Sequence, residues 1–199
     1  MQKDIKMGIF QTKYPGLTQD ILEDYAALTY LNKGEIMHLM KKFYSIDPVK
    51  IDANYHHRFH KDDIIKKFDV LKNNPFQDRI FRVFSSQKDD CFSFEDLLDL
   101  CSVMSPECLP EVKASWAFKI YDMDEDNAIS IQDICNILDR LTCDLNNRGD
   151  HLDEESKLEI AKGIMEKINL DNSGSISVSE FKMVLSRIPE FSSSFYFQL

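Results

Sequence analysis

The chain of 199 residues has few of the features that mark secreted, membrane-spanning or nucleic-acid-binding proteins. Its five cysteines are odd in number and form no CxxC pair, so neither a disulfide framework nor a zinc site is indicated. Lysine and arginine total 24 against 34 acidic residues, giving a net charge of −10. No basic face is available to neutralise phosphates, so we expect no nucleic-acid partner. An acidic chain suits cations or basic amphipathic partners.

Long apolar runs are also missing. No stretch is long enough to span a bilayer, and the N-terminal MQKDIKMGIF lacks the apolar segment of a secretory signal. We therefore expect a cytoplasmic protein with reduced thiols, peripheral at the plasma membrane through a partner. Residues 7–12, MGIFQT, have the spacing of a myristoylation signal, which applies only if translation starts at Met7; a chance match is the alternative.

What the chain does have is an acidic segment at residues 122–133, DMDEDNAISIQD. Alternating carboxylates on a tight turn converge on one hard cation, and a carboxylate at place twelve closes the shell, as in an EF-hand calcium loop. Asn127 replaces the usual Gly at place six and can adopt the left-handed turn. The expected ligands are Asp122, Asp124, Asp126, Ala128 through its carbonyl, Ser130 and Asp133.

Asp133 stands where an EF-hand loop usually has Glu. Because Asp is one methylene shorter, it reaches the ion with one oxygen rather than two. Six-coordinate geometry then becomes easier than seven-coordinate geometry, which favours Mg²⁺ relative to a standard loop. We expect Mg²⁺ or Ca²⁺ here, with reduced calcium selectivity.

The motif repeats along the chain, at 169–180 (NLDNSGSISVSE) and at 85–96 (SSQKDDCFSFED). Apolar residues at spacings of three and four flank all three loops, which indicates an entering and an exiting helix around each. For loop 122–133 these are Ala114, Ala117, Phe118 and Tyr121 before it, and Ile131, Ile134, Leu138 and Leu141 after it.

The other two loops are poorer in charge. Loop 169–180 has Gly174 at place six and Glu180 at place twelve, but its only carboxylates at ligand places are Asp171 and Glu180. Weak calcium binding and a metal-free structural role are both open. Its candidate ligands are Asn169, Asp171, Ser173, Ser175, Ser177 and Glu180. Loop 85–96 keeps only Asp89 and Asp96, and we expect it to bind no metal.

An N-terminal unit completes the pattern. Asn32 and Glu35 form a capping box ahead of a helix, and a second helix is expected near Asp63, running through Ile64, Phe68 and Leu71. The intervening loop lacks metal geometry. The sequence thus predicts an all-α fold of four EF-hand helix–loop–helix units in two paired lobes, the first two loops being degenerate. We expect an N-terminal extension (1–17), an N-terminal lobe (18–105), a metal-binding C-terminal lobe (106–188) and an apolar C-terminal tail (189–199).

The chain resembles the calcium- and integrin-binding proteins, relatives of calcineurin B and the neuronal calcium sensors. The resemblance runs from about Leu22 to Leu199 and is carried by YAALTYLNKGEI, NPFQDRIFRVFS, FSFEDLLDLCSVMS, WAFKIYDMDED and RIPEFSSSFYFQL. An Asp at place twelve of the third loop also fits that family. The family usually has Asp at places one and five of the last loop, where this chain has Asn169 and Ser173.

The resemblance implies a non-enzymatic calcium- and magnesium-binding adaptor or sensor. Such proteins bind amphipathic cytoplasmic helices of membrane proteins, including integrin α tails and transmembrane channel-like mechanotransduction proteins. The alternative is a constitutive structural or regulatory subunit of a channel, kinase or phosphatase, with metal only stabilising the fold.

A partner helix would lie in an apolar groove of the C-terminal lobe. The apolar tail either covers this groove as a ligand that a partner displaces, or packs there permanently. Trp116, off the core face of its helix, is expected to contact the other lobe or the groove. The candidate partner-binding residues are Trp116, Ile134, Leu138, Leu141, Leu185, Phe191, Phe195 and Phe197.

Overall fold

The computed structural model describes residues 13, 14, 16–142, 152–188, 190, 191 and 195. The expected all-α class is confirmed. The elements are α1 (Gln19–Leu28), α2 (Lys33–Tyr44), α3 (Pro48–Ala53), β1 (Phe59–His60), α4 (Lys61–Ile65), the 3₁₀ turn η1 (Asp69–Leu71), α5 (Gln77–Phe84), β2 (Cys91–Phe92), α6 (Phe94–Val103), α7 (Pro110–Tyr121), α8 (Ile131–Thr142), α9 (Glu154–Ile168) and α10 (Val178–Leu185).

The predicted capping box at the start of α2 is confirmed. The Asn32 side chain accepts the backbone N–H groups of Gly34 and Glu35, and the Glu35 carboxylate accepts the N–H of Asn32. These bonds satisfy donors that the first helical turn leaves without partners. The spacing analysis did not predict α1, which Thr18 caps and which packs against α2.

The helix expected near Asp63 is shorter than predicted. It begins at Lys61 and ends at Ile65, and Phe68 has non-helical backbone angles (φ −122°, ψ 76°). Phe68 is buried in the core with Ile64 and Leu71. The chain therefore reaches these core positions through one helical turn and the 3₁₀ turn η1, rather than through one continuous helix.

Short antiparallel pairings join the loops in twos. Phe59 and His60 of β1 pair with Phe92 and Cys91 of β2, which links the first two units. Ile129 and Ile176 form an isolated bridge between loops 122–133 and 169–180. Phe92, Ile129 and Ile176 all occupy place eight of their loops, so the repeat read from the sequence coincides with the pairing in space.

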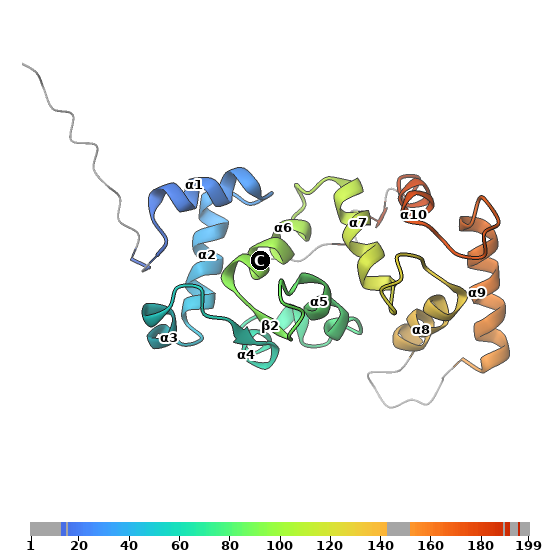
Figure 1. The fold of residues 1–199 in the computed structure, drawn as a ribbon, viewed down its shortest axis with the longest axis horizontal. Coiled ribbons are helices and arrows are strands. Elements are labelled where there is room, and N and C mark those ends of the chain that lie inside the picture. The colour runs from blue at the N-terminus through green and yellow to red at the C-terminus, as the bar shows by residue number, and fades with distance from the viewer. Residues whose placement is uncertain (1–12, 15, 143–151, 189, 192–194, 196–199) are drawn as a thin grey trace, which may run out of the picture.

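Two hydrophobic clusters form the interior. The N-terminal core runs from Tyr14 to Met104 and includes Ile120; the C-terminal core contains Ala117, Phe118, Ile129, Ile134, Cys135, Ala161, Met165, Ile176 and Phe181. Helix α7 lies between them and packs against α5 on one side and α10 on the other (Figure 1). Pro110, which interrupts the helical pattern of the sequence, begins α7, where its missing N–H costs nothing. Among the described residues, none of the helices has both the length and the apolar character needed to cross a membrane.

Candidate metal centre

Loop 122–133 connects α7 to α8 and has the backbone of a cation loop. Two of its residues, Glu125 and Asn127, have positive φ angles of 61° and 68°. Asn127 thus makes the left-handed turn expected of it at place six. This turn reverses the chain tightly enough for the side chains at places one, three and five to face a common point.

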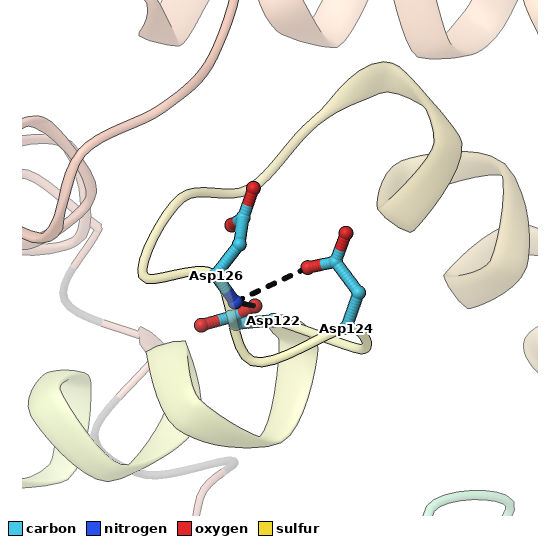
Figure 2. Close-up of side chains that lie close together, drawn as sticks. All are labelled: Asp122, Asp124 and Asp126. Carbon is cyan, nitrogen blue, oxygen red and sulfur yellow. Dashed lines mark hydrogen bonds between the residues drawn. The ribbon is translucent and has the colours of Figure 1, made fainter.

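The carboxylates of Asp122, Asp124 and Asp126 converge there. Each offers an oxygen, and these three atoms lie within 4.8 Å of one another (Figure 2). Oxygens bound to one Ca²⁺ at about 2.4 Å are at most about 4.8 Å apart, so the cluster fits a single ion. In the part of the chain that the structure describes, it is the one group of three or more acidic, His or Cys residues close enough to share a metal.

Backbone hydrogen bonds hold these carboxylates in position. The N–H of Asp126 donates to Oδ1 of Asp122 (3.2 Å) and of Asp124 (3.3 Å), as Figure 2 shows, and the N–H of Asn127 donates to Oδ2 of Asp122 (3.0 Å). Ala128 donates its N–H to Asp126. Burial raises the pKa of Asp122, and the neighbouring carboxylates add to that rise against the backbone hydrogen bonds. A bound cation would oppose this shift by stabilising the ionised form.

Asp133 lies outside this cluster. Its Oδ1 accepts the N–H of Met123 (3.1 Å), and its Oδ2 accepts the N–H (2.8 Å) and hydroxyl (2.6 Å) of Ser130. Ser130 in turn accepts the N–H of Asp133, so the two residues cap the first turn of α8. The structure therefore brings together three of the expected carboxylates and places the fourth across the start of the exiting helix.

Loop 169–180 uses Glu180 in the same way. Its Oε1 accepts the N–H groups of Leu170 (2.7 Å) and Asp171 (3.2 Å), and its Oε2 accepts the N–H (2.9 Å) and hydroxyl (2.7 Å) of Ser177. The hydrogen bond from the Ser177 side chain, followed by those from the backbone, lowers the pKa of Glu180 to about 2. Ser177, expected as a ligand, caps α10.

The other polar groups of loop 169–180 bond to one another. The Ser173 hydroxyl lies 3.0 Å from the carbonyl oxygen of Ser175 and 3.4 Å from Oδ1 of Asn169, so it lies between places one and seven. The Ser173 N–H donates to Asn169 and to Asp171. This loop therefore satisfies several of its ligand oxygens with its own N–H and O–H donors, without the convergence of charge seen in loop 122–133.

Two arginines were missed in the sequence. Arg58 lies among the ligand places of loop 85–96. Aligning Phe59 with Phe92, at place eight of that loop, would have indicated that Arg58 lies there. Arg79 of α5 donates to the carbonyl oxygens of Lys119 (2.9 Å), Ile120 (3.3 Å) and Asp122 (2.6 Å). No sequence signal predicted this second contact, because it joins elements about forty residues apart.

Glu125, at place four of loop 122–133, completes this connection. Its carboxylate accepts hydrogen bonds from Arg79, Arg82 and Lys88 at 2.6–3.2 Å. Arg82, then Lys88 and then Arg79 lower its pKa to about 2. The end of α7 and the first half of the cation loop are thus fixed against α5 and against loop 85–96.

Trp116 contacts the other lobe, one of the two positions expected for it. Its ring stacks on Phe84 of α5, with ring centroids 4.3 Å apart and planes 8° from parallel. Of the other candidate partner-binding residues, Ile134 is buried in the C-terminal core, Leu138 and Leu185 pack partly buried against it, and Leu141 is exposed. Phe197 lies outside the described residues.

Two described residues of the tail, Phe191 and Phe195, pack against the interior. Phe195 packs against the N-terminal and the C-terminal cluster, and its ring stacks on Phe191 with centroids 5.6 Å apart. Its carbonyl oxygen accepts a hydrogen bond of 3.0 Å from Nζ of Lys113, a residue of α7 that is only 1% exposed. Burial lowers the pKa of Lys113.

Comparison with known proteins shows two levels of similarity. Residues 111–186 match the family model of an EF-hand domain pair. Calcium and integrin-binding family member 2 of Homo sapiens is 31% identical over 196 residues, covering 97% of this chain and 100% of that protein. The proteins of the same name from Drosophila melanogaster (31% over 187 residues, 92% and 96%) and Danio rerio (32% over 199 residues, 97% and 100%) are similar to the same extent.

Proposed function

Since the chain belongs to the calcium and integrin-binding family and is therefore a calcium-binding EF-hand protein, we propose that it is a metal-responsive adaptor rather than an enzyme. Its target is an amphipathic helix from the cytoplasmic part of a membrane protein. The name of its relatives, calcium and integrin-binding, supports an integrin tail as the first target to test.

We place the principal ion in loop 122–133. Asp122, Asp124 and Asp126 supply converging charge. Asp133, which joins the two ends of the loop through its bond from Met123, would turn one oxygen of its short side chain to the ion. That short side chain favours six ligands, so Mg²⁺ holds the site at rest and Ca²⁺ competes for it. Loop 169–180, with two carboxylates at its ligand places, binds Ca²⁺ more weakly.

The observation that carries the adaptor proposal is the position of Phe195. An apolar residue of the tail packs against both cores, with Phe191 one helical turn before it, and this i, i+4 spacing is that of an amphipathic helix in a groove. We propose that the tail occupies the target groove and that a partner helix displaces it. The acidic charge of the chain favours a partner whose polar face is basic.

One observation favours the second candidate, a constitutive subunit whose fold metal only stabilises. Ser173 and Glu180 join the parts of loop 169–180 by internal hydrogen bonds, which supports a loop that its own polar groups hold closed. A protein of this kind would bind its partner equally well with and without metal.

Calorimetric titration of the apo protein with an integrin α cytoplasmic-tail peptide tests both candidates. The peptide is titrated in EDTA, in Mg²⁺ and in Ca²⁺, with Trp116 fluorescence as a second signal. We expect peptide affinity to rise at least fivefold with metal, which corresponds to about 1 kcal/mol of coupling. Equal affinity in all three conditions would reject the sensor and support the constitutive subunit.

Two pairs of variants test where the metal ion binds and where the partner helix binds. Asp122→Ala should abolish the tighter metal site, whereas Asp171→Ala should leave it intact; the reverse result would mean that the ion was placed in the wrong loop. Phe195→Ala should raise peptide affinity if the tail competes for the groove, and Leu28→Ala, at an exposed position of α1, serves as its control. Lower affinity in Phe195→Ala would place Phe195 in the partner interface instead.

A further inference from the structure

Loop 85–96 contains a cation that belongs to the chain itself. The guanidinium of Arg58, which comes from the first unit just before β1, lies inside the loop and is only 15% exposed. Its Nη2, which has two N–H donors, lies within hydrogen-bond distance of the Ser85 hydroxyl (2.9 Å), of Asp89 (2.8 Å) and of the carbonyl oxygen of Cys91 (2.6 Å). Its Nη1 donates to Asp96 (2.7 Å).

These acceptors occupy the ligand places of the loop. Counted from Ser85, they are the side chains at places one, five and twelve and the backbone carbonyl at place seven, four of the six places from which an EF-hand loop binds calcium. Nη1 also donates to the Ser86 hydroxyl (2.8 Å), a neighbour of place one. The planar fork of a guanidinium, with several N–H donors, can satisfy acceptors that lie around one point.

The backbone of loop 85–96 agrees with this assignment. Positive φ angles occur at places four and six, Lys88 (54°) and Asp90 (59°). The same two places have positive φ in loop 122–133 and in loop 169–180, where the residues are Glu125 and Asn127, and Asn172 and Gly174. Loop 85–96 therefore folds as a cation loop although its sequence has only two carboxylates at ligand places.

We propose that Arg58 is the resident cation of loop 85–96, holding the N-terminal lobe in its ion-loaded form whether or not divalent metal is present. This inference is independent of the proposed adaptor function, because it concerns the lobe opposite the metal centre. It assigns any response to Mg²⁺ or Ca²⁺ to the C-terminal lobe. The antiparallel pairing of Phe59 with Phe92 positions Arg58, since it brings the residue before Phe59 opposite the residue after Phe92, at place nine, from where its side chain enters the loop.

Charge supports the exchange of a divalent ion for an arginine. Within the loop, Asp89 and Asp96 are both ion-paired with Arg58, leaving one net negative charge for the three groups. Arg58, together with the Ser85 hydroxyl and the Cys91 N–H, holds the pKa of Asp89 at about 2 against its desolvation. A Mg²⁺ or Ca²⁺ ion would have to displace a tethered guanidinium from the same oxygens.

Cation rescue of Arg58→Ala in the full-length protein distinguishes this role from that of an ordinary ion pair. Hydrogen exchange of β1, β2 and α6 is followed in EDTA, first alone and then with 10 mM ethylguanidinium or 10 mM Ca²⁺. In the unaltered protein these amides should stay protected in EDTA, with no change on adding either cation. In Arg58→Ala we expect at least a tenfold loss of protection, which added cation reverses in large part.

Lys61→Ala is the matched control. Lys61 forms an ion pair of 2.9 Å with Asp90 of the same loop, at place six, which is not a ligand place. Its loss should change protection by less than threefold, and added cation should not reverse the change. Equal behaviour of the two variants, or absence of rescue in Arg58→Ala, would overturn the proposal.

If Arg58→Ala does not fold in EDTA, a second variant keeps the test decisive, because an added carboxylate lets Ca²⁺ take the place of the lost guanidinium. Arg58→Ala combined with Ser85→Asp puts a third carboxylate, at place one, into the emptied loop. Calorimetric titration with Ca²⁺ should then count one more ion than in the unaltered protein, with Ser85→Asp alone as control. An unchanged ion count, or a divalent ion in loop 85–96 of the unaltered protein, would show that Arg58 does not occupy a cation site.

Discussion

Replacing Arg79 by alanine tests how strongly the metal loop depends on the N-terminal lobe. Arg79 is 7% exposed and donates to three carbonyl oxygens, those of Lys119, Ile120 and Asp122, as well as to Glu125. Asp122 is also the residue at place one of the cation loop. The last carbonyls of a helix have no partners within it, so the guanidinium supplies donors that α7 lacks.

The expected cost follows from these contacts. A hydrogen bond to a charged group contributes about 1.5–3 kcal/mol, and a buried acceptor left without a donor costs about 1–3 kcal/mol. Because Arg79→Ala removes the donor from three carbonyl oxygens, we expect it to lower the free energy of unfolding by about 3–5 kcal/mol. It should also weaken metal binding, because Asp122 and Glu125 lose a fixed neighbour.

Arg82→Ala is the control for this experiment. Arg82 lies on the same helix and binds the same Glu125 carboxylate, but its side chain is 45% exposed. An exposed ion pair contributes about 0–1 kcal/mol, so this variant should remain close to the unaltered protein. Urea unfolding, followed by Trp116 fluorescence and by circular dichroism, gives both values. If the two variants lost equal stability, the assigned role of Arg79 would be wrong.

Three further predictions concern the remaining contacts. Asp133→Glu should raise Ca²⁺ affinity relative to Mg²⁺ in calorimetry, since the longer side chain offers two oxygens; an unchanged ratio would contradict the six-coordinate site. The pKa of Glu180 is about 2, below its ordinary 4.5, so the stability it contributes is complete above about pH 4.5 and is lost as pH falls toward 2. Glu180→Gln should remove that part of the acid sensitivity in circular dichroism, and an unchanged acid transition would count against it. Phe84→Ala should cost about 3 kcal/mol and change Trp116 emission by removing the stacked ring; an unchanged spectrum would disprove the stack.

Local pattern was enough to predict much of the fold. The spacing of apolar residues indicated the helices around each loop, and the pair Asn32 and Glu35 indicated the start of α2, because both signals act within a few residues of the chain. The same local chemistry predicted the left-handed turn at Asn127 and the convergence of Asp122, Asp124 and Asp126. The predicted helix through Phe68 was too long. Phe68 has non-helical backbone angles and is still buried in the N-terminal core, so packing rather than helical spacing sets its position.

The sequence alone therefore determined that this protein is an all-α EF-hand protein with its charge concentrated in loop 122–133. Tertiary structure alone decided which side chain lies inside loop 85–96 and which side chain joins α5 to the end of α7. Arg58 reaches loop 85–96 from about thirty residues away, and Arg79 reaches the end of α7 from about forty. No local spacing encodes such contacts, because their partners come together only when β1 pairs with β2 and α5 packs on α7.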